Sequence, residues 1–558
     1  MAQLEDRPSQ AAAAAFAGNA RPMMDVQLNA WRLFEHAPAH FGEVELVTRL
    51  HSGELHRTTY ADFAGRAQQL MHALDGLGLE PGDRVATLAW NSVRHLEAYF
   101  AVPCSRRVLH TLNLRLSPAE LGYIIGHAGD RAILVDADLL PLLEQVDAAG
   151  GLRDVRHIVV LADAVPSTTL RNAVAYEELI AGRPVEYPRT EILEDTPLGI
   201  CYTSGTTGRP KGAVYTHRST FLHSLAATSM AALAVGPQDC VLPVVPMFHA
   251  NAWGMPYAAT LVGAKQVFTG PHLDAASLVD MMQRERVTVA GGVPTIWMAV
   301  GEELARTGVA LPSIRHLVCG GSQPPRALIE RFRDQFGIPI VQAWGMTETS
   351  PLASMAWPKN HMQDWDEDRV TDAVRSQAGL PVPLVEVSIR GDGDGGGEAP
   401  RDGETMGDLL VRGPWVVASY LHGDGAEKFT EDGFFRTGDI AVGSPEGYFV
   451  IADRAKDLIK SGGEWISSVD MEAAIMAMPD VAEAAVIAIP HPKWQERPLA
   501  CVVPREGATV TLESVHEHLL GRGFSKWQLP DRVETIEAIP RTGVGKFDKK
   551  VLRARFDT

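Results

Sequence analysis

The sequence is poor in cysteine and has no long apolar run. Only five of its 558 residues are cysteine, and no two of them form a Cys-x-x-Cys pair. This usage argues against a disulfide framework or a zinc site and is typical of a reducing, cytoplasmic compartment. No apolar run approaches the roughly 18 residues that a membrane-spanning helix needs, so we expect no integral membrane segment.

Positive charge is also scarce. Asp and Glu number 69 against 51 Lys and Arg, which gives a net charge of −18. A general nucleic-acid binder needs a basic face, so this balance argues against that class, although a local cationic pocket can still bind an anionic small substrate. The Ala-rich patch at 11–15 follows Glu5 and Asp6, where a signal peptide would carry positive charge. Residues 1–25 are therefore predicted to form a flexible extension.

The first half of the chain alternates helical and strand patterns. Helical spacing of apolar residues marks 60–77, 94–102 and 118–126, and short apolar runs mark 84–90, 132–135 and 158–161 as strands. Such alternation is typical of βαβ units and mostly parallel sheets, so the sequence predicts an α/β fold.

The character of the chain changes twice in the second half. A glycine-rich segment at 391–397 separates two strand-like runs and is predicted to be a hairpin loop. Asp392 and Asp394 alternate with glycine there, but the distal Glu and the register of an EF-hand are missing, so we interpret it as a solvated turn rather than a calcium site. From about Arg454 a smaller α+β pattern begins. We predict two domains, 26–452 and 453–558.

The most informative segment is 202–212, which reads Tyr-Thr-Ser-Gly-Thr-Thr-Gly-Arg-Pro-Lys-Gly. Its glycines let the backbone approach a ligand closely, and its hydroxyl groups and backbone N–H groups can surround phosphate oxygens. Lys211 adds a positive charge. The segment is not a Walker A loop, because Gly208 is followed by Arg-Pro.

This segment resembles the phosphate-binding signature of the adenylate-forming superfamily, which includes acyl-CoA synthetases, peptide-synthetase adenylation domains and luciferases. Six further signatures follow in the family's order, so the resemblance covers nearly the whole chain. One such motif is weak, but the ordered set is very specific. The resemblance implies a large N-terminal domain of stacked α/β sheets with a small β-barrel, and a smaller, mobile α+β C-terminal domain. The six lie at 320–322, 342–348, 435–439, 453–457, 461–465 and 540–546.

The resemblance also implies the reaction. ATP and a carboxylic acid form an acyl-adenylate and pyrophosphate, and CoA then displaces AMP. Positioning and charge neutralisation carry most of the first step. Glu348 is implied as a ligand of Mg²⁺ with Thr203 as its companion, and Lys546 as the lysine that contacts the carboxylate and the α-phosphate.

The same resemblance assigns a nucleotide site. Trp344 offers a flat face for adenine where many relatives have Tyr, and Ala343 replaces a commoner Gly. Asp439 is implied to accept hydrogen bonds from the ribose hydroxyls, assisted by Arg454, and Thr347 to bond the α-phosphate. Lys456 and Lys460 either meet phosphates or form a basic face. The full ATP/AMP-binding set is Ser204, Gly205, Thr206, Thr207, Gly208, Lys211, Gly321, Ser322, Gln342, Ala343, Trp344, Gly345, Thr347, Asp439, Arg454, Lys456 and Lys460.

Two-step chemistry needs two arrangements of the C-terminal domain. Asp453 matches the family's hinge position, where one or two residues can absorb the rotation. The rotation would bring a short segment into the CoA channel. Its residues are Gly462, Gly463, Glu464 and Trp465.

The segment at 246–254 bears on the acid. It resembles that of medium- and long-chain fatty acyl-CoA synthetases, in which the tryptophan gates the acyl tunnel, so Trp253, His249 and Gly292 are expected to line the pocket. Trp253 as a core residue and His249 as a structural histidine remain alternatives. No Asp is present to meet an amino acid's ammonium group, and no carrier domain follows, so free CoA is the expected acceptor. The sequence Ala-Trp-Gly-Met at 343–346 also resembles the corresponding segment of bacterial ligases that act on 3-methylthiopropionate, a short apolar acid.

Several alternatives stay open. A non-catalytic acyl- or nucleotide-binding relative would be expected to have lost Lys546 or Glu348, and both are present. A luciferase-type oxidation after adenylation has no residue in its favour. Arg106 and Arg107 stand where relatives have a small Gly/Ala-rich turn, and we expect both to be solvent-exposed rather than to meet the 3′-phosphate of CoA. A homodimer is compatible with the resemblance.

Overall fold

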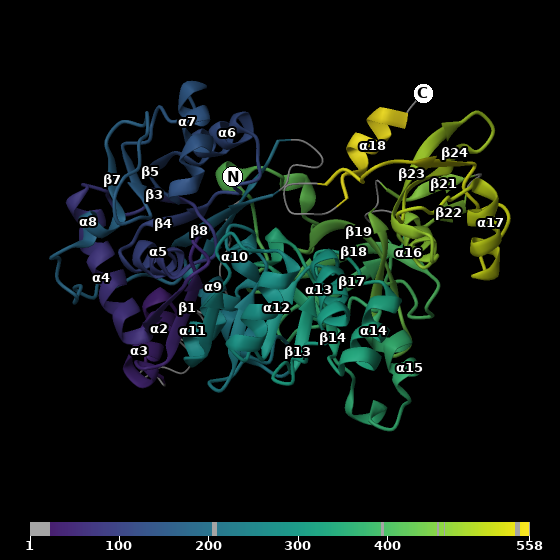
Figure 1. The fold of residues 1–558 in the computed structure, drawn as a ribbon, viewed down its shortest axis with the longest axis horizontal. Helices are drawn as coiled ribbons and strands as arrows, with labels where there is room; N and C mark the ends of the chain where they lie inside the picture. Colours follow the sequence, from purple (N-terminus) through teal and green to yellow (C-terminus); the bar gives the residue numbers. More distant parts are fainter. Residues whose placement is uncertain are drawn as a thin grey trace.

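The computed structural model describes residues 23–203, 209–391, 396–454, 457–461, 464–541 and 547–556. Sheets and helices alternate through the large N-terminal part, and the smaller C-terminal part (yellow in Figure 1) lies at one end of the molecule, beside strands β17 to β19. None of the described helices is both long and apolar enough to cross a membrane. The α/β fold predicted from the sequence is confirmed.

The first sheet contains seven strands in the order β7-β6-β5-β3-β4-β8-β9. All neighbours are parallel except β8 and β9, which form an antiparallel hairpin. Parallel strands require crossover connections, and helices supply most of them here. The strands are β3 (Arg84–Leu88), β4 (Val108–Thr111), β5 (Asp130–Val135), β6 (His157–Val160), β7 (Ala173–Ala175), β8 (Pro197–Tyr202) and β9 (Gly212–Thr216). The helices are α4 (Tyr60–Gly76), α5 (Val93–Cys104), α6 (Pro118–Ala128), η1 (Ala137–Leu139), α7 (Leu140–Ala148) and α8 (Tyr176–Ile180).

The second sheet contains nine strands in the order β16-β15-β14-β13-β12-β10-β11-β1-β2. Its centre, from β14 to β1, is parallel, and both edges are antiparallel. The strands are β1 (Glu45–Arg49), β2 (Leu55–Thr59), β10 (Cys240–Pro243), β11 (Lys265–Phe268), β12 (Val289–Gly292), β13 (His316–Cys319), β14 (Ile340–Gly345), β15 (Leu352–Met355) and β16 (Leu380–Pro381). The helices and short turns around it are α2 (Ala30–Phe34), α3 (His36–Phe41), α9 (His217–Thr228), α10 (Ala250–Trp253), α11 (Met255–Val262), α12 (Ala275–Arg284), α13 (Pro294–Thr307), α14 (Arg326–Phe336), η2 (Thr347–Thr349), η3 (Asn360–Met362), α15 (Glu367–Val370) and η4 (Thr371–Arg375).

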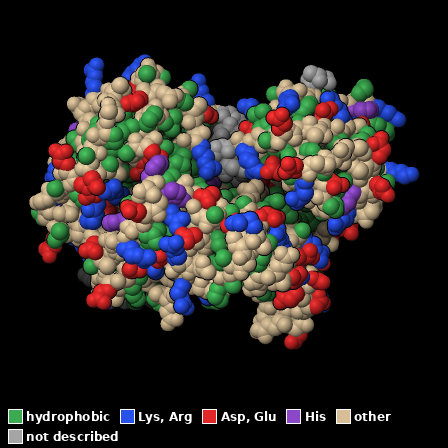
Figure 2. Space-filling model, viewed as in Figure 1, with side chains coloured by type: hydrophobic (Ala, Val, Ile, Leu, Met, Phe, Trp, Pro, Cys, Tyr) green, Lys and Arg blue, Asp and Glu red, His purple; other side chains and the backbone are tan. Residues whose placement is uncertain are grey.

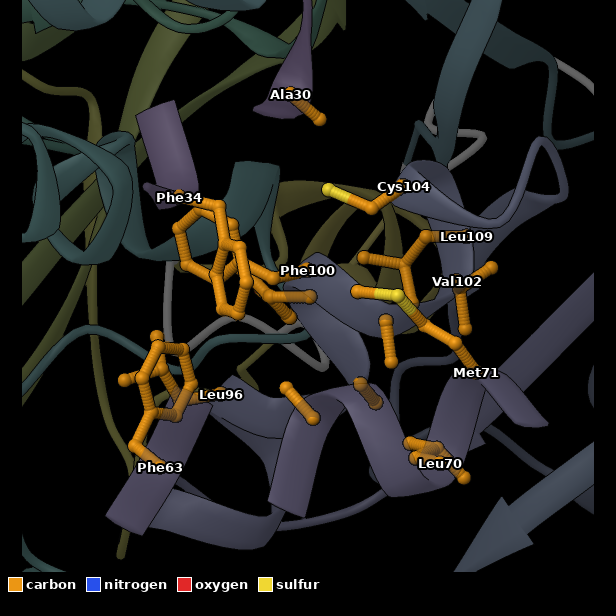
Figure 3. Close-up of a cluster of buried hydrophobic side chains, with 14 of the residues drawn as sticks. Ala30, Phe34, Phe63, Leu70, Met71, Leu96, Phe100, Val102, Cys104 and Leu109 are labelled. Carbon is orange, nitrogen blue, oxygen red and sulfur yellow. The ribbon is translucent and has the colours of Figure 1, made fainter. Parts of the chain in front are cut away.

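The largest apolar cluster fills the space between these two sheets. Phe34, Phe63 and Phe100 from α2, α4 and α5 pack together there, with ring centroids 5.6–5.7 Å apart (Figure 3). Each buried aromatic side chain of this kind contributes about 1.5–3 kcal/mol to stability. Further clusters lie on the outer faces, where α6 and α7 cover the first sheet and α12, α13 and α14 cover the second. The result is a stack of alternating helical and sheet layers.

A four-stranded antiparallel sheet follows, in the order β17-β18-β19-β20. Strands β17 and β18 form the predicted hairpin, although Asp392 and Asp394 lie outside the described residues. The strands are β17 (Glu386–Arg390), β18 (Met406–Arg412), β19 (Phe435–Gly443) and β20 (Phe449–Arg454), and the turns are η5 (Leu421–Gly423) and η6 (Ala426–Lys428).

The C-terminal part is built on a five-stranded sheet. One apolar cluster packs the sheet against α16 and α17, and a second packs its other face against α18. The strands are β21 (Ile459–Ser461), β22 (Glu464–Ile466), β23 (Val481–His491), β24 (Gln495–Pro504) and β25 (Arg532–Thr535), and the helices are α16 (Ser468–Met476), α17 (Leu512–Gly521) and α18 (Lys549–Phe556).

The two adjacent arginines after α5 have opposite environments. Arg106 is exposed, as expected, but the expectation of exposure was wrong for Arg107, which is buried. The Arg107 guanidinium lies 2.8 Å from an Asp75 carboxylate oxygen and donates to the backbone carbonyls of Ser105 and Leu79. These partners compensate the buried charge of Arg107. The sequence around Arg107 does not indicate that such partners are present.

Candidate active site

The β8–β9 hairpin holds the two ends of the predicted phosphate-binding segment together. The backbone N–H of Thr203 donates to the Lys211 carbonyl at 3.0 Å, and the Lys211 N–H donates to the Thr203 Oγ1 at 3.2 Å. Five residues predicted to bind the nucleotide lie outside the described residues, namely Ser204, Gly205, Thr206, Thr207 and Gly208. Strand β8 ends at the carboxyl edge of the first sheet, where open α/β sheets bind ligands.

Glu348 lies on η2, beside this hairpin. The Tyr215 hydroxyl on β9 donates to the Thr347 carbonyl at 2.7 Å, which ties η2 to the hairpin. Glu348 is buried, and the Tyr420 hydroxyl donates to its Oε1 at 2.5 Å. Burial, followed by the charge of Glu348, raises the pKa of Tyr420, so the phenol stays protonated and keeps donating. The carboxylate is therefore held in one orientation.

Glu348 and Thr203 carry the kinds of oxygen atom that a magnesium ion would bind together with the phosphates of a ligand. No group of three or more His, Cys, Asp or Glu side chains that could hold a metal occurs in the part of the chain that the structure describes. Mg²⁺ is usually held by one or two protein carboxylates, with phosphates and waters completing its octahedron. The oriented carboxylate of Glu348 and the hydroxyl of Thr203 supply donors of that kind.

Trp344 and Asp439 form the candidate nucleoside end of the site. They lie on β14 and β19, and the Trp344 indole N–H donates to the Asp439 Oδ2 at 3.2 Å. The indole also packs edge-on against Phe449, with centroids 5.7 Å apart. Asp439 is opposite Arg454 in the β19–β20 register. The structure thus brings together the residues predicted for adenine and ribose, which are 95 residues apart in the chain.

Backbone geometry explains two glycines of this wall. A Cβ at Gly345 would lie 1.8 Å from the Pro351 carbonyl oxygen, so no larger residue fits there. Gly321 has a φ of 82°, in the left-handed region that favours glycine. Gln342, Ala343 and Thr347 are buried beside them, and Ser322 is exposed.

A cavity of about 230 Å³ lies beside this wall, and its interior is largely apolar. His249, Trp253, Gly292 and Gly321 line it, so three residues predicted for the acyl pocket converge on one space. The side chains that supply most of the apolar lining are Val244, Val245, Pro246, Leu273, Val293 and Ile296.

Trp253 reaches the cavity from an unusual turn. The residues of α10, together with Gly254, all have positive φ angles of 43–72°, a left-handed turn in which four of the five residues are not glycine. Non-glycine residues in this region cost about 1 kcal/mol or more each, and such strain clusters at functional sites. The indole packs over Gly320, where an added Cβ would lie 3.0 Å from its Cη2. Gly320, which directly follows β13, has no side chain and therefore leaves room for the Trp253 indole.

Two arginines of the same cavity were not among the residues predicted from the sequence. Arg115 follows β4, and among the described residues its guanidinium has no ion-pair or hydrogen-bond partner. Desolvation lowers its pKa from 12.5, although it remains a cation. Arg541 comes from the C-terminal part, where it pairs with Glu483 and lies over the ring of Phe547. The position of Arg115 just past the end of a parallel strand was the available signal.

The predicted hinge residue joins the two parts of the chain. Asp453 lies on β20, and its Oδ2 accepts hydrogen bonds from the backbone N–H and the hydroxyl of Ser468, at 2.7 and 2.6 Å. The Lys549 ammonium donates to the same hydroxyl at 2.6 Å and lies 2.7 Å from Glu472 Oε1. Burial raises the pKa of Glu472, and the charge of Lys549 opposes that shift. A buried polar cluster therefore surrounds the residue predicted to be the hinge.

The remaining predicted residues are less fully described. Lys460 is exposed on β21, and its backbone N–H donates to Glu496 at 2.8 Å. Arg454 lies on β20, and Glu464 and Trp465 lie on β22. Lys456, Gly462, Gly463 and Lys546 lie outside the described residues. Figure 2 shows a hollow between the N-terminal and C-terminal parts, flanked by Lys and Arg side chains.

Comparison with known families gives two matches that together span most of the chain. The model of the AMP-binding enzyme family matches residues 34–421. The model of the AMP-binding enzyme C-terminal domain matches residues 470–546.

Named relatives match along nearly their whole length. A long-chain-fatty-acid–CoA ligase of Thermus thermophilus is 52% identical over 539 residues, which cover 96% of each chain. A 3-methylmercaptopropionyl-CoA ligase of Ruegeria lacuscaerulensis is 42% identical, over 96% of this chain and 98% of its own. Among solved structures, ATP-bound MatB from Rhodopseudomonas palustris superposes with a TM-score of 0.81 at 27% identity, over 95% of this chain and 99% of its own.

Proposed function

The chain belongs to the AMP-binding enzyme family and is an acyl-CoA ligase that works through an acyl-adenylate, and from this premise we propose that its acid is apolar, with a medium- or long-chain fatty acid favoured. The observation that carries an apolar acid is the cavity beside Trp253, which has an apolar interior and the cations of Arg115 and Arg541 in its lining, and the similarity to the Thermus long-chain-fatty-acid–CoA ligase supports the longer chain. An aliphatic chain suits the interior and a carboxylate suits the cations.

In the first step a carboxylate oxygen of the acid attacks the α-phosphorus of ATP. The bond to pyrophosphate breaks, and pyrophosphate leaves with the electron pair. Because attacking group and target are both anions, the protein must orient them and offset their charge. In this proposal His249 and Arg115, which line the acid cavity, hold the carboxylate end, and Lys211, whose ammonium lies 3.2 Å from Glu427 in this structure, turns to the phosphates when ATP binds.

Glu348 and Thr203 would hold magnesium, which would neutralise charge on the phosphate oxygens. Tyr420 serves this role indirectly, because its hydroxyl fixes the Glu348 carboxylate. Trp344 and Asp439 would hold adenine and ribose. Their mutual hydrogen bond orients both groups before a nucleotide binds.

In the second step the thiolate of CoA attacks the acyl carbon, the bond to AMP breaks and the thioester forms. We propose that the part of the chain after Asp453 presents Lys546 for the first step and rotates to open the CoA channel for the second. Arg541, five positions before Lys546 in the sequence, lines the acid cavity, which supports an adenylation arrangement here. The domain boundary at 452/453 and the roles of Lys456, Lys460 and 462–465 belong to the same proposal.

We also propose a reducing, cytoplasmic location. All five cysteines are buried and unbonded, including Cys104 and Cys319, which fits a compartment where thiols stay reduced. A homodimer remains compatible with the proposal.

A ladder of saturated acids from acetate to palmitate, with 3-methylthiopropionate included, tests the choice of acid. We expect CoA-dependent AMP formation to rise toward medium and long chains. Trp253→Ala should move the chain-length optimum, because the indole borders the cavity. Trp494→Ala is the matched control, since that tryptophan is exposed on the C-terminal part. If no apolar acid supports pyrophosphate release, the proposal is wrong. If Trp253→Ala leaves the chain-length profile unchanged, Trp253 is a core residue without a role in acid selection.

A short acid such as 3-methylthiopropionate is the second candidate. The cavity of about 230 Å³ favours it, because it is smaller than the ~300–1,000 Å³ of typical small-molecule sites. The Ruegeria relative carries a name of that substrate class. A rate maximum at the short or thioether acid would select this candidate.

A further inference from the structure

A second, larger cavity lies at the opposite edge of the first sheet from the candidate active site. Its volume is about 540 Å³. Arg84, Val108 and Pro197 line it, and they begin the parallel strands β3, β4 and β8. Ile200, on the same strand, also lines the cavity and lies three residues before Thr203, so the nearer end of the cavity is about 10 Å from the phosphate-binding segment, and it shares no lining residue with the acid cavity. It is therefore separate from the acid cavity.

The interior of this second cavity is apolar and suits an aliphatic chain. Its volume falls within the ~300–1,000 Å³ typical of small-molecule sites. Leu193 keeps 60% of its surface exposed at the mouth, an uncovered apolar side chain beside an apolar space. The apolar lining consists of Pro81, Val108, Ile192, Leu193, Pro197, Ile200, Val214 and Leu421.

Two arginines give this apolar space a cationic end. Arg106 has no side-chain partner among the residues that the structure places, whereas Arg84 donates from its Nε to the Ala128 carbonyl at 2.8 Å and also interacts electrostatically with the buried Asp130. One acid, Glu191, also lines the cavity, with Thr196 and the buried His217 as its other polar side chains. The balance of two cations and one anion suits a ligand with a single negative charge better than a nucleotide or CoA.

The backbone holds Arg106 in place. Its φ is 64°, which is uncommon for a residue other than glycine. Its carbonyl accepts from Gly82 at 2.8 Å and its N–H donates to Pro103 at 3.0 Å. The next residue, Arg107, is anchored in the interior by Asp75. The chain thus keeps Arg106 at the cavity despite a strained backbone, and such strain is often kept where it serves a function.

We propose that this cavity is a second, non-catalytic binding site for an apolar monocarboxylate, with the aliphatic chain along Ile200 and Val214 and the carboxylate at Arg106 and Arg84. The ligand shares its chemical class with the acid of the proposed reaction. Its binding, however, requires none of the groups that bind ATP.

The test is equilibrium binding of decanoate to the full chain while the active site is filled by a non-hydrolysable acyl-adenylate analogue. We expect one decanoate per chain. Arg106→Asn should weaken binding about 5-fold, the upper end for an exposed charge contact, and asparagine tolerates the left-handed backbone. Leu193→Glu should abolish binding, because it places a like charge at the mouth. The matched control is Arg286→Asn, another exposed arginine with a positive φ of 54°, which should bind as the parent does.

Three outcomes would overturn the proposal. They are no decanoate bound to the blocked parent protein, equal affinity in Arg106→Asn, or equal affinity for decanol, which would leave the arginines without a role. Because no turnover is measured, the result is distinguishable from failure of the proposed ligase activity. That failure would show instead as absent pyrophosphate release.

Discussion

The N-terminal and C-terminal sides of the candidate site are held in different ways. On the N-terminal side, hydrogen bonds between separate elements fix each functional group, as in Tyr420 to Glu348 and Trp344 to Asp439. On the C-terminal side, the observed ties are the cluster at Asp453 and the approach of Arg541 to the acid cavity. A fixed half and a half joined at few points suit a reaction whose two steps need different arrangements.

The largest loss of activity should come from removing Lys546, the lysine that the C-terminal side is proposed to bring into the active site. We expect Lys546→Ala to slow pyrophosphate release by up to about 10³-fold, ~4 kcal/mol, because one preorganised charge at the developing transition state is lost. Thioester formation from preformed acyl-AMP should be nearly unchanged. Lys550→Ala, a nearby exposed lysine, is the control. Equal loss of both half-reactions would refute the assigned role and the division between the two sides.

Breaking the cluster at the hinge should loosen the C-terminal side next. Lys549→Met removes the cation 2.7 Å from the buried Glu472 and leaves that carboxylate uncompensated, at a cost of about 3 kcal/mol. We expect denaturant unfolding to begin in the C-terminal part, with proteolytic cuts near the boundary at lower denaturant than in the parent. Lys550→Met should behave as the parent. If the two variants unfold alike, the cluster does not secure this half.

Acid should weaken the N-terminal side through a buried histidine. His223 accepts a hydrogen bond from the Leu352 N–H at 3.2 Å, and burial lowers its pKa from 6.5 to about 4. Below about pH 6.5 the unfolded chain takes up a proton that the folded chain does not, so this histidine's contribution to stability is complete above that pH and is lost as pH falls toward 4.

The variant His223→Gln isolates this contribution. Its destabilisation relative to the parent should be smaller at pH 5 than at pH 7 by about 2 kcal/mol. Free energies of unfolding from denaturant titrations at both pH values give the difference directly. A destabilisation that is independent of pH would show that His223 does not stay neutral in the fold.

The smallest effect should come from the hydroxyl that orients Glu348. Tyr420→Phe removes one buried hydrogen bond to a carboxylate, and we expect about a 5-fold rise in the Mg²⁺ concentration needed for half-maximal adenylation, ~1 kcal/mol. Tyr187→Phe is the control, because Tyr187 makes the same bond to Asp75 on an exposed surface. A lower maximal rate with unchanged magnesium dependence would mean that Tyr420 does not act through Glu348.

Local patterns predicted the elements well. The helix expected at 60–77 is α4 (Tyr60–Gly76), and the helix expected at 118–126 is α6 (Pro118–Ala128). Helix α6 begins with a capping box of Ser117 and Glu120 and ends at Gly129 with a φ of 71°. Apolar periodicity and helix-capping signals depend on residues that are close together in the sequence, so they can be recognised before the fold is known.

Contacts between distant segments could not be predicted in this way. The burial of Arg107 depends on Asp75, and the orientation of Glu348 depends on Tyr420, 72 residues away. The left-handed turn at α10 contains alanine, asparagine and tryptophan, so no glycine marks it. Motif resemblance supplied the candidate site residues instead, and their individual roles stay predictions until the variants above are measured.

The close packing of Trp253 on Gly320 joins two binding events. Gly320 precedes Gly321 on the segment predicted to border the adenine, and its other neighbour is the indole that borders the acid cavity. In the proposed roles of these two segments, an acid that shifts the indole would shift the nucleotide wall as well. By thermodynamic reciprocity, whatever factor a given acid applies to ATP affinity, ATP must apply to the affinity of that acid. Selectivity among acids would then depend on nucleotide concentration.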